Sequence, residues 1–269
     1  MAQTSPAAGS IPSLSSDQLG EFLELLPSVD SVELKLTVPD AYRRSTVTGL
    51  GLDPLDAQIR QIVFFDTADL ALDRGGVVVR ARRIQGRDGD SVIKLRPVEP
   101  AQLSDATRAL PGFGVEVDAS PGGFVCSASM KSSADDARIK GVLSGDKPVH
   151  KLFSKHQREF FTARAPDGIE LDDLLTLGPI TVFKLKFTPK ALERRVVAEL
   201  WFYPDGSRIL ELSTKSHPAG AFQAAAETKA FLAAHGIDLS APQQTKTRSA
   251  LEFFAAELAG HPQGSSTGL

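Results

Sequence analysis

The chain of 269 residues is 42% hydrophobic and 23% charged, which is typical of a globular protein, and we expect one main domain. Its formal net charge of -3 argues against a broadly basic surface of the kind that coats nucleic acid, so any affinity for anions must be local. The single cysteine, Cys126, excludes an internal disulfide and a cysteine-based metal centre.

Both ends of the chain are rich in Ser, Gly, Pro and Ala and contain little that could be buried. We therefore expect disordered tails over residues 1–15 and 259–269, and a single domain over 16–258. The first residues lack the basic start and apolar run of a secretory signal, and no stretch approaches ~18 consecutive apolar residues. These features predict a cytoplasmic protein without a membrane span.

The first predicted elements are a short helix and a strand. Ser16 can cap an apolar run that ends at Pro27, which is the pattern of a helix start and stop. From Ser31 the pattern changes to period two, and the strand that this predicts has an apolar face and a polar face that carries Glu33 and Lys35.

The next region predicts a β-hairpin with basic side chains on one face. In GVVVRARR, Arg80 and Arg82 alternate with apolar residues, and in SVIKLRP, Lys94 and Arg96 do the same. The segment GRDGD between them has the composition of a tight turn.

Residues 98–150 mix loop, strand and helix signals, and we expect an insertion or lid there. Period two returns in VFKLKF, where Lys184 and Lys186 share the polar face. A second hairpin turns at residues 204–206 and carries Glu199 on one arm and Glu211 on the other. After Pro218 the composition predicts two helices, over about 219–236 and 242–258.

The polar face of any one such strand most often meets water. Here, however, the pattern recurs in several strands, and the polar face is rich in Lys, Arg and Glu. A closed antiparallel β-barrel with a charged lumen explains the whole set, and the predicted helices can cover its apolar outer face. The predicted lumen cations are Lys35, Arg80, Arg82, Lys94, Arg96, Lys131, Arg158, Lys184 and Lys186.

So many facing cations repel one another in a partly desolvated space unless an anion neutralises them. Phosphate groups suit such a site because the guanidinium fork of Arg binds their oxygens. The carboxylates Glu33, Glu199 and Glu211 are oxygen ligands of the kind that Mg2+ or Mn2+ accepts. No phosphate-binding GxxxxGK[ST] loop, GxGxxG, HExxH or GxSxG motif points to another chemistry.

Several separated motifs resemble the CYTH family, also called triphosphate tunnel metalloenzymes, over about Val32 to Lys215. The most specific is FFDTADLALDRGGVVVRARR, with Asp66, Arg80 and Arg82. Weaker matches are Lys94 in SVIKLRP, Arg158 in KHQREFF and Glu211 in ILELSTK. Members of this family include thiamine triphosphatases, inorganic triphosphatases and class IV adenylate cyclases.

The resemblance implies a mainly β (α+β) fold, a closed antiparallel barrel with two C-terminal helices, that uses Mg2+ or Mn2+ to hydrolyse a linear triphosphate. It implies catalytic roles for Glu33, Lys35 and Glu211, and metal ligation by Glu33, Glu199 and Glu211. It implies substrate binding by Lys35, Arg80, Arg82, Lys94, Arg96, Arg158, Lys184 and Lys186. The expected partner is a small-molecule triphosphate rather than a membrane or a nucleic acid polymer.

Two positions depart from the family pattern, because Ser31 and Ser213 stand where the family usually has glutamates. Both departures remove a candidate metal ligand, for which Glu116 or Asp118 could compensate. The alternatives are therefore a non-catalytic tunnel that binds polyphosphate or a nucleotide, and an adenylate cyclase. A barrel for an organic carboxylate or lipid ranks below these, because the lumen cations disfavour an apolar ligand.

Overall fold

The fold is described from a computed structural model that defines residues 14–237, 239, 243 and 246–260. The expected tails therefore fall mostly outside the described residues. The strands are β1 (Ser31–Val38), β2 (Gln58–Asp66), β3 (Val77–Ile84), β4 (Arg87–Leu95), β5 (Phe113–Ser120), β6 (Gly123–Ala134), β7 (Leu175–Phe187), β8 (Val196–Phe202) and β9 (Arg208–Ser216). The helices are α1 (Ser16–Leu25), α2 (Arg43–Gly49), α3 (Ala71–Arg74), α4 (Asp105–Arg108), α5 (Asp136–Leu143), α6 (Lys155–Thr162), α7 (Ala221–Ala234) and α8 (Lys246–Gly260).

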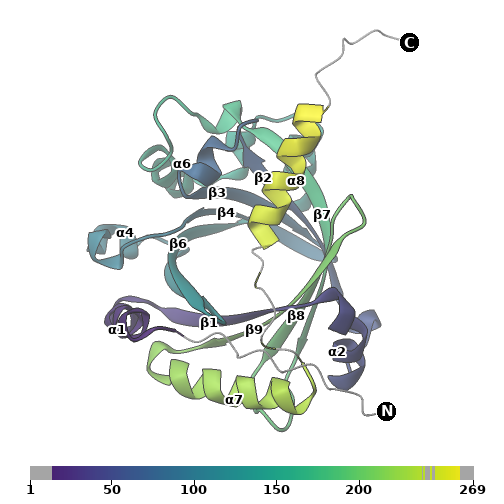
Figure 1. Cartoon of the computed structure of the whole chain (residues 1–269). Helices are drawn as coiled ribbons and strands as arrows, with labels where there is room; N and C mark the ends of the chain where they lie inside the picture. Colours follow the sequence, from purple (N-terminus) through teal and green to yellow (C-terminus); the bar gives the residue numbers. More distant parts are fainter. Residues whose placement is uncertain (1–13, 238, 240–242, 244–245, 261–269) are drawn as a thin grey trace.

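The nine strands form a closed barrel in the order β1-β5-β6-β4-β3-β2-β7-β8-β9, which confirms the predicted barrel (Figure 1). The expectation that it is antiparallel throughout is wrong at one place, because β1 and β5 are parallel. A ring with an odd number of strands cannot alternate direction all the way round, so at least one neighbouring pair must be parallel. All other neighbouring pairs are antiparallel, including the closing pair of β1 and β9.

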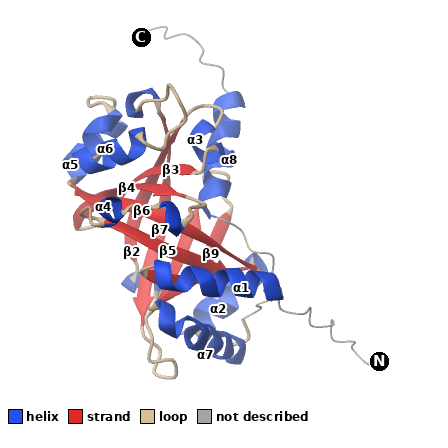
Figure 2. Cartoon of the chain, turned by 90° about the vertical axis from the view of Figure 1, so that its left-hand side faces the viewer, coloured by secondary structure: helices blue, strands red, loops and turns tan. Residues whose placement is uncertain are grey.

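Helices cover the apolar outer face of the barrel (Figure 2). Ile139 of α5 and Phe161 of α6 share a buried cluster with Ile93 of β4 and Met130 of β6. On the other side, Leu232 of α7 belongs to a second cluster that includes Leu36, Leu210 and Leu212 of β1 and β9. The apolar faces that period two predicted are thus buried under helices, and the charged faces point inward.

The second C-terminal helix, α8, lies beside β2 and β7 at one end of the barrel (Figure 1). Its residues Ala250, Leu251 and Phe254 pack against Ile62 and Val182, which share a face with the lumen residues. Ile62 of β2 lies directly opposite Arg82 of β3, and antiparallel partners point to the same side of the sheet. The part of the lumen wall that β2 and β7 form here is therefore apolar and covered by α8. None of the helices in the described ranges is long and apolar enough to cross a membrane.

Two predicted segments differ from the expectation. The segment 98–150, expected as an insertion or lid, supplies β5 and β6 to the barrel and continues into α5. The segment KHQREFF, which resembled an arginine strand, is helix α6. Ser154 and Gln157 form a reciprocal capping box that starts this helix, and Gln157 then bonds to Ser91 and to the carbonyl of Met130 on the barrel wall.

Candidate functional site

The strand register brings the predicted cations together inside the barrel. Arg82 lies opposite Asp90, Arg80 opposite Val92, and Val78 opposite Lys94, so these side chains share the inner face of β3 and β4. On the far wall, Lys184 lies opposite Glu199, which in turn lies opposite Glu211. Lys35 lies opposite Ser213.

Three carboxylates meet where β1 and β5 run in parallel. Glu33 and Asp118 are direct partners, and Glu116 lies two residues before Asp118, so the carboxylate oxygens come within 4.8 Å of one another. We call Glu33, Glu116 and Asp118 the acidic triad. Ser31, at the first position that differs from the family pattern, is the direct partner of Glu116.

Basic side chains surround the acidic triad. The Lys35 ammonium lies 2.8 Å from Asp118 and 3.3 Å from Glu33. Lys94 lies 3.1 Å from Glu116 and 3.2 Å from Asp118, and Arg96 also pairs with Asp118. Every carboxylate of the triad therefore has at least one cation as a partner.

Burial and neighbouring charge shift the protonation of this cluster. Burial, with the charge of Arg96, lowers the pKa of Lys94 to about 7 although Glu116 opposes that shift. Burial would raise the pKa of Glu116, but the charges of Lys94 and Lys215 outweigh it and lower the pKa to about 2. Lys94 is consequently the lumen cation whose charge changes near neutral pH, whereas Glu116 stays ionised.

Arg80 and Arg82 differ in how they are compensated. Arg82 makes a bidentate pair with Asp90, at 2.8 and 2.6 Å. Arg80 forms no ion pair with any described carboxylate, and its buried Nε has no hydrogen-bond partner among the described residues. Burial and the charge of Arg82 lower the pKa of Arg80 to about 10, so it remains charged at neutral pH. Arg80 is thus a half-buried arginine whose guanidinium has no carboxylate partner among the described residues.

A second ion-pair cluster connects α8 with β7, β8 and β9. Lys246 of α8 reaches 2.6 Å from both Glu199 and Glu211, and it lies over the ring of Trp201. Lys184 also contacts Glu199, at 2.7 Å. These cations hold the pKa of the buried Glu199 well below its usual value although burial opposes them.

The two clusters differ in how well their carboxylates are suited to bind a divalent metal ion. Oxygen ligands suit Mg2+ and Mn2+, and the acidic triad supplies three carboxylates within reach of one ion. In contrast, Lys246 already neutralises Glu199 and Glu211 from within the chain. The donor set is therefore compatible with a metal at Glu33, while metal ligation by Glu199 and Glu211 stays a prediction that requires Lys246 to move.

Two residues of the matched motifs lie outside the lumen cluster. Arg158 is on α6, exposed, and donates to the carbonyl of Phe153, so its predicted position on a lumen strand is wrong. Asp66 accepts hydrogen bonds from the backbone of Leu72 and Asp73, at 2.9 and 3.0 Å. Its contacts therefore hold the turn into α3 and strand β3.

Several residues that the fold brings to the lumen were not among the predicted site residues. Lys246 was missed because its place depends on how α8 packs against the barrel end. Asp90 stands in the predicted turn GRDGD, yet β4 begins at Arg87 and includes it. The alternation Val115, Glu116, Val117, Asp118 was a usable signal for the inner face of β5.

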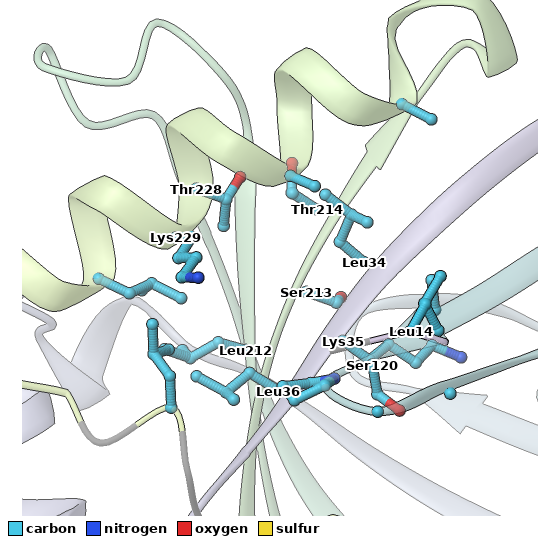
Figure 3. A pocket seen from close by; sticks show the side chains of 18 of the residues that line it. Leu14, Leu34, Lys35, Leu36, Ser120, Leu212, Ser213, Thr214, Thr228 and Lys229 are labelled. Atoms are coloured by element: carbon cyan, nitrogen blue, oxygen red, sulfur yellow. The ribbon is translucent and has the colours of Figure 1, made fainter. Parts of the chain in front are cut away.

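A cavity of about 480 Å3 that the described residues line is a different feature from the charged lumen. It lies under α7 and is mostly apolar. Figure 3 shows Thr228 and Lys229 of α7 on one side and Leu36 and Leu212 of the facing strands on the other. Lys35 and Ser213 also belong to its wall, so the cavity borders the barrel wall near the acidic triad.

Solved structures of other proteins are similar to this chain in fold, although their sequence identity to it is low. No family model matches the sequence, and no curated protein matches it. A "putative adenylate cyclase" from Bacillus halodurans has a TM-score of 0.58 at 13% identity, over 82% of this chain and 97% of that chain. A "putative adenylyl cyclase" from Hippeastrum, described as having a dominant triphosphatase activity, has a TM-score of 0.60 at 16% identity, over 82% and 95%. These likenesses show a shared fold, and they are consistent with the triphosphate tunnel fold that the motifs resemble.

Proposed function

We propose that the chain binds a linear triphosphate in the barrel lumen and hydrolyses its terminal phosphoanhydride bond with the help of Mg2+ or Mn2+. The observation that carries this proposal is Arg80, a half-buried arginine whose buried Nε has no hydrogen-bond partner and whose guanidinium has no carboxylate partner among the described residues, beside further lumen cations. Keeping such a charge buried is costly unless an anion neutralises it. The triphosphatase activity of the Hippeastrum protein supports the choice of triphosphate.

In this proposal the lumen cations hold and orient the phosphate chain. Arg80 binds phosphate oxygens directly, while Lys35, Lys94 and Arg96 turn from the acidic triad toward the ligand. Glu33, with Glu116 or Asp118, would hold the divalent ion. When bound, the ion supplies charge neutralisation on the phosphate oxygens and activation of water. Water adds to the terminal phosphorus, the bridging P–O bond breaks, and orthophosphate and diphosphate are released.

The test is a phosphate-release screen with purified protein against tripolyphosphate, ATP and thiamine triphosphate, each with Mg2+, Mn2+ or EDTA. We expect release with metal and none with EDTA, and we expect Arg80→Ala and Glu33→Ala each to abolish release. Arg138→Ala is the matched control, because Arg138 lies on the exposed side of α5 and pairs locally with Asp135. Absence of release from every substrate with every metal would sink the proposal.

A second candidate is a tunnel that binds triphosphate without turnover. The observation that favours it is the pairing of Lys246 with Glu199 and Glu211, together with serine at positions 31 and 213. Under this candidate, tripolyphosphate binds tightly in EDTA by calorimetry and is recovered intact after incubation with metal. Formation of cyclic AMP from ATP in the same screen would instead indicate a cyclase, as the two neighbours are named.

A further inference from the structure

A small polar cavity of about 260 Å3 lies at the end of the barrel opposite α8. It is lined by Asp56, Gln58, Arg60, Arg87, Lys184 and Lys186, and we call it the mouth. Its residues come from the start of β2, the start of β4 and the end of β7, which meet at this rim of the barrel. The mouth thus lies at a rim of the barrel away from the lumen residues that α8 packs against.

The mouth holds an excess of positive charge that the described residues do not compensate. Lys184 pairs with Glu199 at 2.7 Å, but Arg60 hydrogen-bonds only to the amide oxygen of Gln58, at 3.2 and 2.8 Å. Neither Arg87 nor Lys186 forms an ion pair with a described carboxylate, and Asp56 is the one acid in the wall. Three cations therefore share the mouth without a carboxylate partner.

Arg60 distinguishes the mouth from an ordinary solvated surface. It is 5% exposed, so its guanidinium cannot be fully hydrated. Burial lowers the pKa of Arg60, and the charges of Arg82 and Arg87 lower it further while Glu199 opposes them. Burial also lowers the pKa of Lys186, followed by the charges of Arg60, Arg195 and Arg87. These cations repel one another across the cavity, and an anion between them would relieve that repulsion.

We infer that the mouth is a second oxyanion site, formed by Arg60, Arg87, Lys184 and Lys186, that takes a phosphate group separately from the interior site at Arg80. Two planar guanidinium groups beside two flexible ammonium groups are a suitable donor set for the three free oxygens of a phosphate. The cavity volume is suited to one such group rather than to a nucleoside. The inference rests on the proposed function only in naming phosphate among oxyanions, because the excess charge is independent of hydrolysis.

Calorimetry in EDTA at fixed ionic strength tests the site with inorganic phosphate and tripolyphosphate as the probes. In Arg80→Ala, where the interior site is weakened, phosphate should still bind at the mouth. Adding Arg87→Ala and Lys186→Ala, both at exposed positions, should weaken that binding by at least about tenfold. Adding Arg138→Ala and Lys140→Ala instead, which removes two exposed cations of α5, should leave it unchanged.

A spectroscopic signature locates the bound anion. The Nε–H of Arg60 donates to Gln58, so its side-chain NMR resonance should shift when phosphate binds to Arg80→Ala and should not shift in the Arg87→Ala, Lys186→Ala background. Equal phosphate affinity in the mouth variant and the α5 variant would overturn the inference. So would an Arg60 resonance whose chemical shift does not change when phosphate is added. Failure of the proposed function looks different, because phosphate release would then be absent while mouth binding persists.

Discussion

At the scale of single residues, Lys94 and Arg80 show how one lumen holds two kinds of cation. Both are buried and both lie near another arginine, so the pKa of each is lowered. The guanidinium starts from a much higher value and stays charged, whereas the Lys94 ammonium reaches about 7. Only the charge of Lys94 can therefore respond to physiological changes in pH.

We expect the affinity for tripolyphosphate to fall as the pH rises from about 6 to about 9, approaching tenfold per pH unit above the pKa of Lys94 if only its charged form binds. The charged groups that face Lys94 are Arg96, Lys35, Glu116 and Asp118, and an added phosphate favours the protonated ammonium. Binding of tripolyphosphate is thus coupled to protonation of Lys94. Because this protonation becomes less favourable as the pH rises, the affinity falls.

Calorimetry in EDTA, with and without Lys94→Arg, measures this effect. The variant keeps its charge throughout the range, so the fall with pH should disappear. Because tripolyphosphate itself loses protons as the pH rises, the comparison of the two proteins isolates the contribution of Lys94. An identical pH profile in both proteins would contradict the assignment.

At the scale of elements, the attachment of α8 depends on a lysine buried between two glutamates. Lys246 contacts Glu199 and Glu211, and its carbonyl accepts a hydrogen bond from the Tyr203 hydroxyl at 3.0 Å. Removing Lys246 leaves two buried carboxylates with less compensation. We expect Lys246→Met to lower the free energy of unfolding by roughly 3 kcal/mol, because a buried charge without its partner is costly.

Denaturant unfolding of a small set of variants checks this coupling. Glu211→Gln in the Lys246→Met background should recover part of the lost stability, since the added substitution removes a carboxylate that has lost its partner. Arg248→Ala on the same helix breaks only an exposed pair with Glu252 and should change stability by at most ~1 kcal/mol. Additive losses from Lys246→Met and Glu211→Gln would show that the pair contributes no coupling.

The elements that could be predicted from the sequence are those whose pattern is local. The alternation of apolar and charged residues predicted β1, the β3–β4 hairpin and the β8–β9 hairpin, because each of these strands has one apolar face and one charged face. The helical nature of Lys155–Thr162 was missed, although its Ser154 and Gln157 capping box was present in the sequence. The positions of Arg60 and Lys246 could not be read locally, because the closed register of the barrel and the packing of α8 determine them.

At the scale of the whole molecule, the barrel differs from an ordinary sheet, in which the polar face meets the solvent, because here the polar face lines the lumen. Its apolar face points outward under α5, α6 and α7, so the charged residues gather in the lumen. The lumen carboxylates are paired with cations of the same chain. Among the described residues, the cations without a carboxylate partner are Arg80 inside and Arg60, Arg87 and Lys186 at the mouth. A chain of net charge -3 can thus hold a local anion site.

Whether that lumen also holds a metal depends on the balance of carboxylates, and serine-to-glutamate substitutions can shift it. Ser31 is the direct partner of Glu116, and Ser213 is the direct partner of Lys35, so Ser31→Glu with Ser213→Glu adds two oxygen ligands around the acidic triad. We expect the double variant to bind Mn2+ at least about tenfold more tightly, because each added carboxylate supplies a charged ligand. Calorimetry with Mn2+ measures the change.

The same double variant separates the two candidate functions, because added metal ligands matter only if the metal limits turnover. If the natural chain is a binding tunnel, phosphate release from tripolyphosphate should appear in the double variant and not in the parent. Ser133→Glu is the control, since Ser133 lies opposite Asp90 in the same lumen and adds charge away from the triad. A folded double variant that gains neither Mn2+ affinity nor phosphate release would show that the serines do not limit metal binding.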